Sequence, residues 1–451
     1  MKRHLVPACL ASVLGCLAWL SLGLVPIQAR AATELEVTTS ADAGAGSLRW
    51  ALEQAQQAGG PWRIDFGDNQ GLFSDPRTIE LESPLPQIRG QVTIDGFIDH
   101  RLWTAYGATI SAGGKHRIFE IAPGGVLHLV GITLTGGFAS RGGAVLNRGR
   151  LIVEGVTLIE NRAREHGGAI VNLGGVVFVI NSSIADGEAK RGGAIANLDG
   201  VLTMTHATLY RNKAEIGLAI FSRGTLGLAN SILWGDEVQA GGQCVNTGEL
   251  LYSVANLFVD NSEGCGKPLV QADPKIGRLG YYNGPTPVFD IGGDSAALNL
   301  ADGKFAIGHN GERLDWDQRG NGDPRFVAGW ADIGAFERQS QLPDEYLVDT
   351  IEDTGLRGCT ATGMANCPLR AAVELALAGR EPAPIRFSPR VFSEPQTLEL
   401  RELPVDIDRR ALDFDAGGAA SVTIVIPVDL PWRGRNGVRF EIDPQPPGQS
   451  R

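Results

Sequence analysis

The chain has 451 residues and a formal net charge of −11, from 40 basic and 51 acidic side chains. This acidity argues against a nucleic-acid-binding protein, which needs a basic surface to neutralise phosphates. Glycine contributes 60 residues while 43% of the chain is apolar, so the composition indicates a turn-rich globular protein and excludes a disordered one. At this length we expect one elongated repeat domain or about two to three ordinary domains.

The first 31 residues have the pattern of an export signal. Lys2 and Arg3 precede an apolar stretch over residues 10–27, and a small-x-small sequence follows it. We therefore expect cleavage between Ala31 and Ala32. Two alternatives are lipidation at Cys16, which follows Leu-Gly, and an uncleaved membrane anchor.

No later part of the sequence approaches the ~20 consecutive apolar residues that a membrane helix needs. After signal removal the sequence thus predicts no transmembrane segment. The expected location is extracellular or at the outer membrane or cell surface, with the periplasm as the alternative.

A short glycine-rich motif recurs at a step of 25 residues. It reads Gly-Gly-Ala, two aliphatic residues and Asn, and it is followed each time by two further short apolar runs. Three β runs per unit close one coil of a solenoid, because no run is long enough for a helix, and a β-propeller blade needs about 40 residues. We predict an all-β, right-handed parallel β-helix of three-strand coils, each of about 24–25 residues. The motif copies span residues 142–147, 167–172 and 192–197, with degenerate copies at 217–222 and 241–246.

Equivalent residues of successive units should stack along the solenoid. The aliphatic positions should form an inward ladder, with Cys244 next in line. The Asn positions should lie where the strand turns, in a left-handed backbone conformation, with each amide bonded to its copy one coil away. The inward ladder comprises Val145, Ile170, Ile195 and Ile220, and the amide ladder comprises Asn147, Asn172 and Asn197.

Two segments have the spacing of an amphipathic capping helix. Residues 48–55 follow the N-cap residue Ser47, and their apolar face should cover the N-terminal end of the solenoid core. Residues 368–376 repeat this pattern, and the flanking runs repeat with it, so a second β-helix begins near residue 340 and stays incomplete.

Four cysteines remain after signal removal, and they fall in two local pairs. In an exported chain an even number favours disulfides. We expect bridges between Cys244 and Cys265 and between Cys359 and Cys367, with buried thiols as the alternative.

Three of these motifs resemble segments of bacterial exported β-helix proteins. The caps, above all the Cys-Pro-Leu-Arg-Ala-Ala sequence at 367–372, resemble the CSLREA-type N-terminal segment. The Gly-Gly-Ala-Ile units are similar to repeats of polymorphic outer-membrane proteins and of the wider pectin-lyase-like superfamily. Residues 317–320 and 332–337 resemble the choice-of-anchor Q segment. The resemblance implies a surface or secreted β-helix and leaves the activity open, because one fold serves many functions.

The expected organisation follows from these motifs. It consists of a signal peptide (1–31), an N-terminal cap with the first coils (32–111), a parallel β-helix ending in the choice-of-anchor Q-like segment (112–338), and a second cap with an incomplete β-helix (339–451).

Enzymes of the pectin-lyase type act on polysaccharides through carboxylates on adjacent coils, with calcium in the lyases. Glu160 and Asp186 are acids one coil apart that suggest such a pair, with Asn212 expected next in the column. A solvated turn has the same composition, so these are weak catalytic candidates. His128 and His206 fall in strand runs and are expected to be structural.

A strip of alternating charge occupies the longest turns of three coils. It is typical of a salt-bridged exterior and also fits a binding strip for an acidic glycan. It comprises Arg162, Arg164, Glu165 and His166, then Glu188, Lys190 and Arg191, then Lys213 and Glu215.

Asp315, Asp317 and Asp323 weakly resemble a calcium loop, but Arg319 occupies a ligand position and Phe326 replaces the bidentate acid. A rigid turn is the favoured interpretation, so no cofactor is expected, with calcium as the weaker alternative. The leading functional hypothesis is a non-enzymatic, exported β-helix that contacts an extracellular glycan or another surface protein. The alternative is a polysaccharide lyase or glycoside hydrolase.

Overall fold

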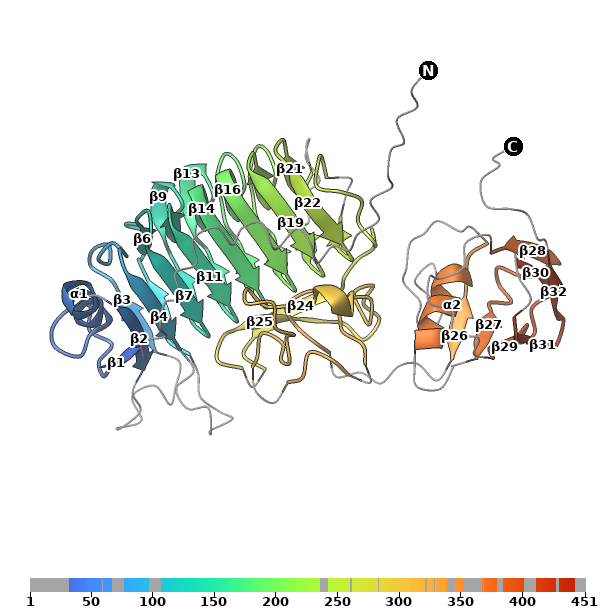
Figure 1. The fold of residues 1–451 in the computed structure, drawn as a ribbon. Coiled ribbons are helices and arrows are strands. Elements are labelled where there is room, and N and C mark those ends of the chain that lie inside the picture. Colours follow the sequence, from blue (N-terminus) through green and yellow to red (C-terminus); the bar gives the residue numbers. More distant parts are fainter. Residues whose placement is uncertain are drawn as a thin grey trace, which may run out of the picture.

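The chain folds into a right-handed parallel β-helix whose coils stack along one axis (Figure 1). The predicted signal peptide and Ala31 lie outside the described residues, which begin at Ala32. This computed structural model describes residues 32–58, 60–66, 77–96, 107–235, 242–259, 262–282, 284–320, 323–327, 329–338, 345–351, 367, 369–378, 384–400, 411–426 and 430–442.

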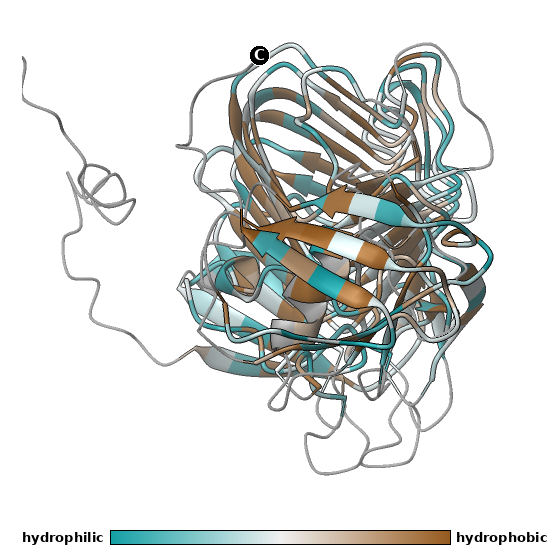
Figure 2. Ribbon diagram, turned by 90° about the vertical axis from the view of Figure 1, so that its right-hand side faces the viewer, coloured by the Kyte–Doolittle hydropathy of each residue, from teal (hydrophilic) through white to brown (hydrophobic). Residues whose placement is uncertain are grey.

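The largest face of the solenoid is a parallel sheet of 13 strands. The first and second runs of each coil both belong to this sheet. In β14 and β16 the two runs are continuous and form a single 11-residue strand, which joins the two stacks of strands into one sheet. Hydrophobic and hydrophilic residues alternate along the strands (Figure 2), as expected when one side of a sheet faces the core. The strands are β1 (Thr33–Val37), β2 (Pro61–Phe66), β4 (Gln91–Asp95), β6 (Phe119–Ile121), β7 (Val126–Val130), β10 (Val145–Asn147), β11 (Arg150–Glu154), β14 (Ile170–Ile180), β16 (Ile195–Thr205), β18 (Ile220–Ser222), β19 (Thr225–Ala229), β21 (Cys244–Asn246) and β22 (Leu250–Val254).

The third run of each coil forms a second parallel sheet of eight strands. Two residues separate it from the large sheet in coil after coil, and the first of them has a left-handed backbone. This turn is called the left-handed corner below. The strands are β3 (Thr78–Glu80), β5 (Thr109–Ser111), β8 (Thr133–Thr135), β12 (Thr157–Ile159), β15 (Ser183–Ala185), β17 (Thr208–Tyr210), β20 (Ile232–Trp234) and β23 (Leu257–Phe258). The corner residues are Gly131, Gly155, Asn181, His206, Asn230 and Ala255, with φ between 44° and 64°.

The aliphatic ladder stacks in the predicted register. Val145 pairs with Ile170, which pairs with Ile195, and the column continues through Ile220 to Cys244. All five side chains are fully buried in one continuous hydrophobic core. Each coil thus buries its apolar side chains against its two neighbours, which is why the stack is stable although a single coil is not.

The Asn ladder lies within strands and not at a left-handed turn. Asn147 ends β10, while Asn172 and Asn197 lie inside β14 and β16. Nδ2 of Asn147 donates to Oδ1 of Asn172 at 2.8 Å, and Nδ2 of Asn172 donates to Oδ1 of Asn197 at 2.9 Å. None of the three has a positive φ, so the predicted left-handed backbone is wrong at these positions. Extended backbone keeps the strand pairing here, and the side chains alone form the ladder.

Helix α1 (Leu48–Ala58) caps the N-terminal end of the solenoid. Leu48, Ala51, Leu52 and Ala55 are buried in the solenoid core, as the spacing predicts. The backbone N–H of Trp50 donates to the Ser47 hydroxyl at 3.2 Å, so Ser47 is the N-cap. The cap covers a sheet end that would otherwise be open to pairing with another chain.

Beyond β23 the chain folds back along the left-handed corner (Figure 1). This return segment, residues 276–338, contains the antiparallel pair β24 (Ile276–Gly280) and β25 (Val288–Ile291) and a 3-10 turn over Gly303–Phe305. Corner side chains hold it in place: Asn181 Nδ2 donates to the carbonyl of Trp316 at 2.7 Å. Asn230 Nδ2 likewise donates to the carbonyl of Asp302 at 3.0 Å.

A buried network of charged side chains lies within the return segment. It includes residues of the part whose sequence resembles choice-of-anchor Q. Arg325 is fully buried, and its Nη2 donates to Asn181 Oδ1 at 2.9 Å and to the carbonyl of Ala335 at 2.7 Å. The carboxylate of Asp332 accepts backbone N–H bonds from Asn299 and Arg338, both at 2.7 Å. Buried charges need such partners, so this network fixes one geometry for the return segment.

Glu337 also belongs to this network, because its Oε2 accepts the backbone N–H of Asp332 at 2.7 Å and lies 3.6 Å from Arg325 Nη1. Burial, reinforced by the neighbouring Asp332 carboxyl, outweighs the attraction of Arg325 and raises the pKa of Glu337 to about 10. An acid whose pKa is higher in the folded state binds more protons there, so folding weakens as the pH rises between the two pKa values. We expect the free energy of unfolding to fall as the pH rises from about 4.5 towards about 10. Urea unfolding at several pH values within that window measures it.

Glu337→Gln supplies the control for this prediction. The amide keeps the shape of the side chain and does not ionise, so the variant should match the parent at pH near the ordinary carboxyl pKa and lose less stability above it. If the free energy of unfolding of the variant and of the parent changes equally with pH, Glu337 is not the cause of the pH dependence.

The C-terminal part of the chain repeats the start of a β-helix, as the sequence predicts. Helix α2 (Leu369–Ala378) buries Leu369, Ala372, Val373 and Ala376, which lie on the predicted apolar face. Two short parallel sheets accompany it, one of four strands, which includes a strand before the helix, and one of three. They comprise β26 (Tyr346–Val348), β27 (Ile385–Phe387), β29 (Asp413–Asp415) and β31 (Arg433–Arg435), and β28 (Gln396–Glu399), β30 (Val422–Ile426) and β32 (Val438–Ile442).

Cys244 and Cys265 form a disulfide with an S–S distance of 2.08 Å. Cys367 is also disulfide-bonded. Cys359 lies outside the described residues, so its pairing with Cys367 stays a prediction. Among the helices of the described residues, none is long and apolar enough to cross a membrane.

Candidate functional site

The longest turns of four successive coils form a narrow parallel ribbon on the outside of the solenoid. Strands β9 (Phe138–Arg141) and β13 (Arg162–His166) pair in parallel, and single bridges extend the pairing from Arg162 to Glu188 and from Glu188 to Lys213. The sequence predicted a charged strip at these turns. The structure adds their strand pairing, which holds the side chains in fixed columns.

Three of the four turns of the ribbon have a buried alanine flanked by two outward residues. Ala163, Ala189 and Ala214 are buried, while the residue on either side of each alanine is exposed. Alternation of this kind is the pattern of a strand with one face on the protein and the other in solvent. The result is an open pocket of about 620 Å³. It is lined by Phe138, Arg162, Ala163, Arg164, Glu188, Ala189, Lys190, Lys213, Ala214 and Glu215.

The pocket is locally basic, although the chain as a whole is acidic. Its lining carries four basic side chains and two acidic ones. Arg162 Nε lies 3.7 Å from Glu188 Oε2, and both side chains are more than half exposed, so this ion pair is weak. Among the residues that the structure describes, Arg164, Lys190 and Lys213 lie within ion-pair distance of no carboxylate. These three cations are therefore available to an anionic ligand.

Two neighbouring titratable groups do not change this charge balance. Burial lowers the pKa of His166, so its imidazole is neutral at neutral pH. A hydrogen bond from Arg141 Nε at 2.9 Å lowers the pKa of Glu165, so this carboxylate stays charged but is paired. The basic character of the pocket therefore comes from arginine and lysine alone.

The two weak catalytic candidates lie one above the other at another corner of the coils. Glu160 and Asp186 both have a left-handed backbone, with φ of 57° and 52°. The next residue in their column is Arg211 and not Asn212, and its guanidinium holds the Asp186 carboxylate through bonds of 2.9 and 2.7 Å. Asn212 is buried one position further and binds the backbone of Gly187. The predicted polar column with Asn212 is therefore wrong.

An arginine occupies the centre of the loop that weakly resembled a calcium site. The guanidinium of Arg319 bonds to Asp317 Oδ2 at 2.7 Å and lies 2.7 Å from Asp323 Oδ1. Asp315 is exposed, and its carbonyl accepts the backbone N–H of Arg325 at 2.8 Å. The cation between Asp317 and Asp323 is thus a side chain of the protein itself.

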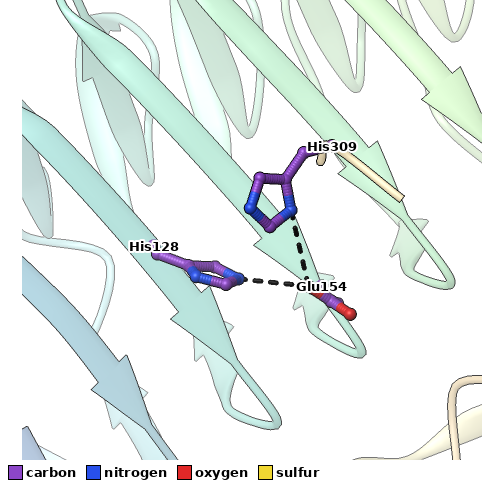
Figure 3. A group of neighbouring side chains, drawn as sticks. All are labelled: His128, Glu154 and His309. Atoms are coloured by element: carbon purple, nitrogen blue, oxygen red, sulfur yellow. Dashed lines mark hydrogen bonds and ion pairs between the residues drawn. The ribbon is translucent and has the colours of Figure 1, made fainter. Parts of the chain in front are cut away.

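A cluster of two histidines and a glutamate was not predicted. His128 lies in β7 and Glu154 ends β11 on the adjacent coil, while His309 comes from the return segment (Figure 3). Their ligand atoms all lie within 4.8 Å of one another, an arrangement that could hold a metal ion.

His206, which was expected in a strand, lies instead at the left-handed corner with φ of 48°. It is fully buried there, and its imidazole contacts the amide of Asn230 at 3.1 Å.

In the cluster of His128, Glu154 and His309, the surroundings lower the pKa values of Glu154 and His309. The hydrogen bond from His128 lowers the pKa of Glu154, so the carboxylate is charged at neutral pH. Burial lowers the pKa of His309, so its imidazole is neutral.

Comparison of the sequence with protein-family models gives no match, and no curated protein matches it significantly.

Proposed function

We propose that this protein is an exported or cell-surface β-helix that binds an acidic extracellular glycan in the basic pocket, without cleaving it. The observation that carries the proposal is the set of unpaired cations, Arg164, Lys190 and Lys213, on adjacent coils of the ribbon. Successive coils repeat at roughly 4.8 Å. Lys213 lies in the column of Arg162 and Glu188, and Arg164 and Lys190 lie beyond the buried alanine of their turns, so the pocket presents cations on three adjacent coils in two columns. A linear polymer with a carboxylate on each sugar is complementary to cations spaced along the solenoid axis in this way.

Two further features support the proposal. Phe138 lines the pocket, and the guanidinium of Arg164 lies over its ring at 5.4 Å, so an aromatic ring adjoins the cations. The resemblance of the caps, the repeats and residues 317–337 to CSLREA-type, polymorphic outer-membrane and choice-of-anchor Q segments supports export and a surface location. The same resemblance to the pectin-lyase-like superfamily keeps polysaccharide cleavage as the alternative function.

The pocket proposal predicts that binding depends on charge at defined positions. A double charge reversal, Arg164→Glu with Lys190→Glu, should weaken binding of polygalacturonate at least tenfold, about 1.4 kcal/mol, and added salt should weaken the parent complex as well. Isothermal titration against polygalacturonate oligomers, with a neutral glucan as the reference ligand, measures the effect. Both residues are exposed, so the variant should fold like the parent.

The matched control reverses two exposed cations of the return segment, Arg278→Glu with Lys304→Glu, and changes the net charge equally. Equal affinity losses in the two double variants would mean that only overall charge matters, and the proposed pocket would be wrong. Release of unsaturated or reducing ends from the polymer, with or without calcium, would instead favour the enzymatic alternative.

A further inference from the structure

The return segment crosses the outer face of the large sheet at His128 and Glu154. In the strand register His128 pairs with Ile152, so Glu154 lies two residues along the adjacent strand and on the same face. His309 reaches this face from the return segment, and its ring packs edge-on against that of His128 at 5.0 Å (Figure 3). Three side chains from two coils and a distant segment thus converge.

Only one of the two histidines is within hydrogen-bond distance of Glu154. His128 Nε2 lies 3.2 Å from Glu154 Oε2, whereas His309 Nδ1 lies 3.8 Å from the same oxygen, which is too long for a hydrogen bond. His309 Nδ1 is buried and has no hydrogen-bond partner among the described residues. Two imidazole nitrogens and a carboxylate oxygen around one point are the donors that Zn²⁺ and similar divalent transition metals prefer.

We propose that His128, Glu154 and His309 bind a divalent transition-metal ion that fastens the return segment to the β-helix. The three side chains are between 20% and 34% exposed, so the site lies near the surface. The Phe178 ring lies edge-on to that of His309, with the ring centroids 6.2 Å apart. The site shares no residue with the basic pocket, so this proposal is independent of glycan binding.

The test uses the full exported chain without a histidine tag, treated with EDTA and dialysed, and Zn²⁺ alone as the probe. Isothermal titration should show one Zn²⁺ bound per chain, and Zn²⁺ should raise the melting temperature and protect the return segment near His309 from proteolysis. His309→Ala and Glu154→Gln should each weaken binding by at least tenfold, since each removes one of three ligands. In neither variant should Zn²⁺ protect the return segment.

Two matched variants serve as controls. Glu312→Gln removes a neighbouring exposed acid, and His166→Ala removes a half-buried histidine of the ribbon, so both should bind Zn²⁺ like the parent. The proposal is overturned if the parent binds no Zn²⁺, if His309→Ala binds it with unchanged affinity, or if the control variants lose it to the same extent. Circular dichroism of each variant separates loss of the site from loss of the fold.

Discussion

Replacing Ile195 by Asp should destabilise the β-helix more than any other single change considered for this protein. Ile195 is fully buried and stacked between Ile170 and Ile220, so the substitution places a carboxylate among aliphatic side chains without a partner. We expect a loss of more than about 4 kcal/mol in the free energy of unfolding. Because the strands of each coil pair only with those of the neighbouring coils, the transition should also broaden or divide into two. Thermal unfolding followed by circular dichroism measures both effects.

Two milder variants calibrate this result. Ile195→Val removes one methylene and should cost about 0.5–1.5 kcal/mol. Asn197→Ala removes one step of the amide ladder, which includes the bond from Asn197 Nδ2 to Ser222 Oγ at 3.2 Å, and should cost less than the aspartate. Parent-like unfolding of Ile195→Asp together with collapse of Asn197→Ala would contradict the assignment of Ile195 to the buried core and of Asn197 to the amide ladder within β16.

Replacing Arg325 by Ala should have the second largest effect, and it should act first on the return segment. Arg325 bonds to Asn181 at the left-handed corner and to the carbonyls of Gly334 and Ala335. Its loss leaves a cavity, carbonyl oxygens without a donor and buried carboxyl groups without their neighbouring cation. The free energy of unfolding should fall by about 3–5 kcal/mol. Hydrogen exchange should accelerate in residues 323–338 before it accelerates in β14.

The control for Arg325 is Arg278→Ala on strand β24. Arg278 also belongs to the return segment but is exposed, so its removal should change stability by about 0.5 kcal/mol or less. Equal destabilisation by the two substitutions, or simultaneous opening of β14 and the return segment, would show that the buried network does not hold this segment separately.

The repeat made the β-helix predictable, because equivalent residues 25 positions apart must stack when strands pair in parallel. The register of Ile170, Ile195 and Ile220 followed from that step alone. The backbone conformation of Asn172 did not, because one amide side chain serves equally well at a turn and in a ladder. The left-handed positions proved to lie elsewhere, at Asn181 and its equivalents.

The candidate sites were predictable only where they follow the repeat. The charged strip recurs with the coils, so the sequence placed Arg162 and Glu188 on adjacent turns, and only the pocket and its unpaired cations needed the structure. His309 has no place in the repeat, because the return segment brings it to His128 from far along the chain. A tertiary contact of this kind leaves no periodic signal in a single sequence.

The most direct test of glycan binding in the basic pocket is lysine footprinting in the presence of polygalacturonate. The described residues contain six lysines, all exposed, of which Lys190 and Lys213 line the pocket. Acylation followed by mass spectrometry should show these two protected by the polymer, while Lys115, Lys267, Lys275 and Lys304 react as in the free protein. Unchanged reactivity of Lys190 and Lys213 under saturating polymer, or uniform protection of all six lysines, would contradict binding in this pocket.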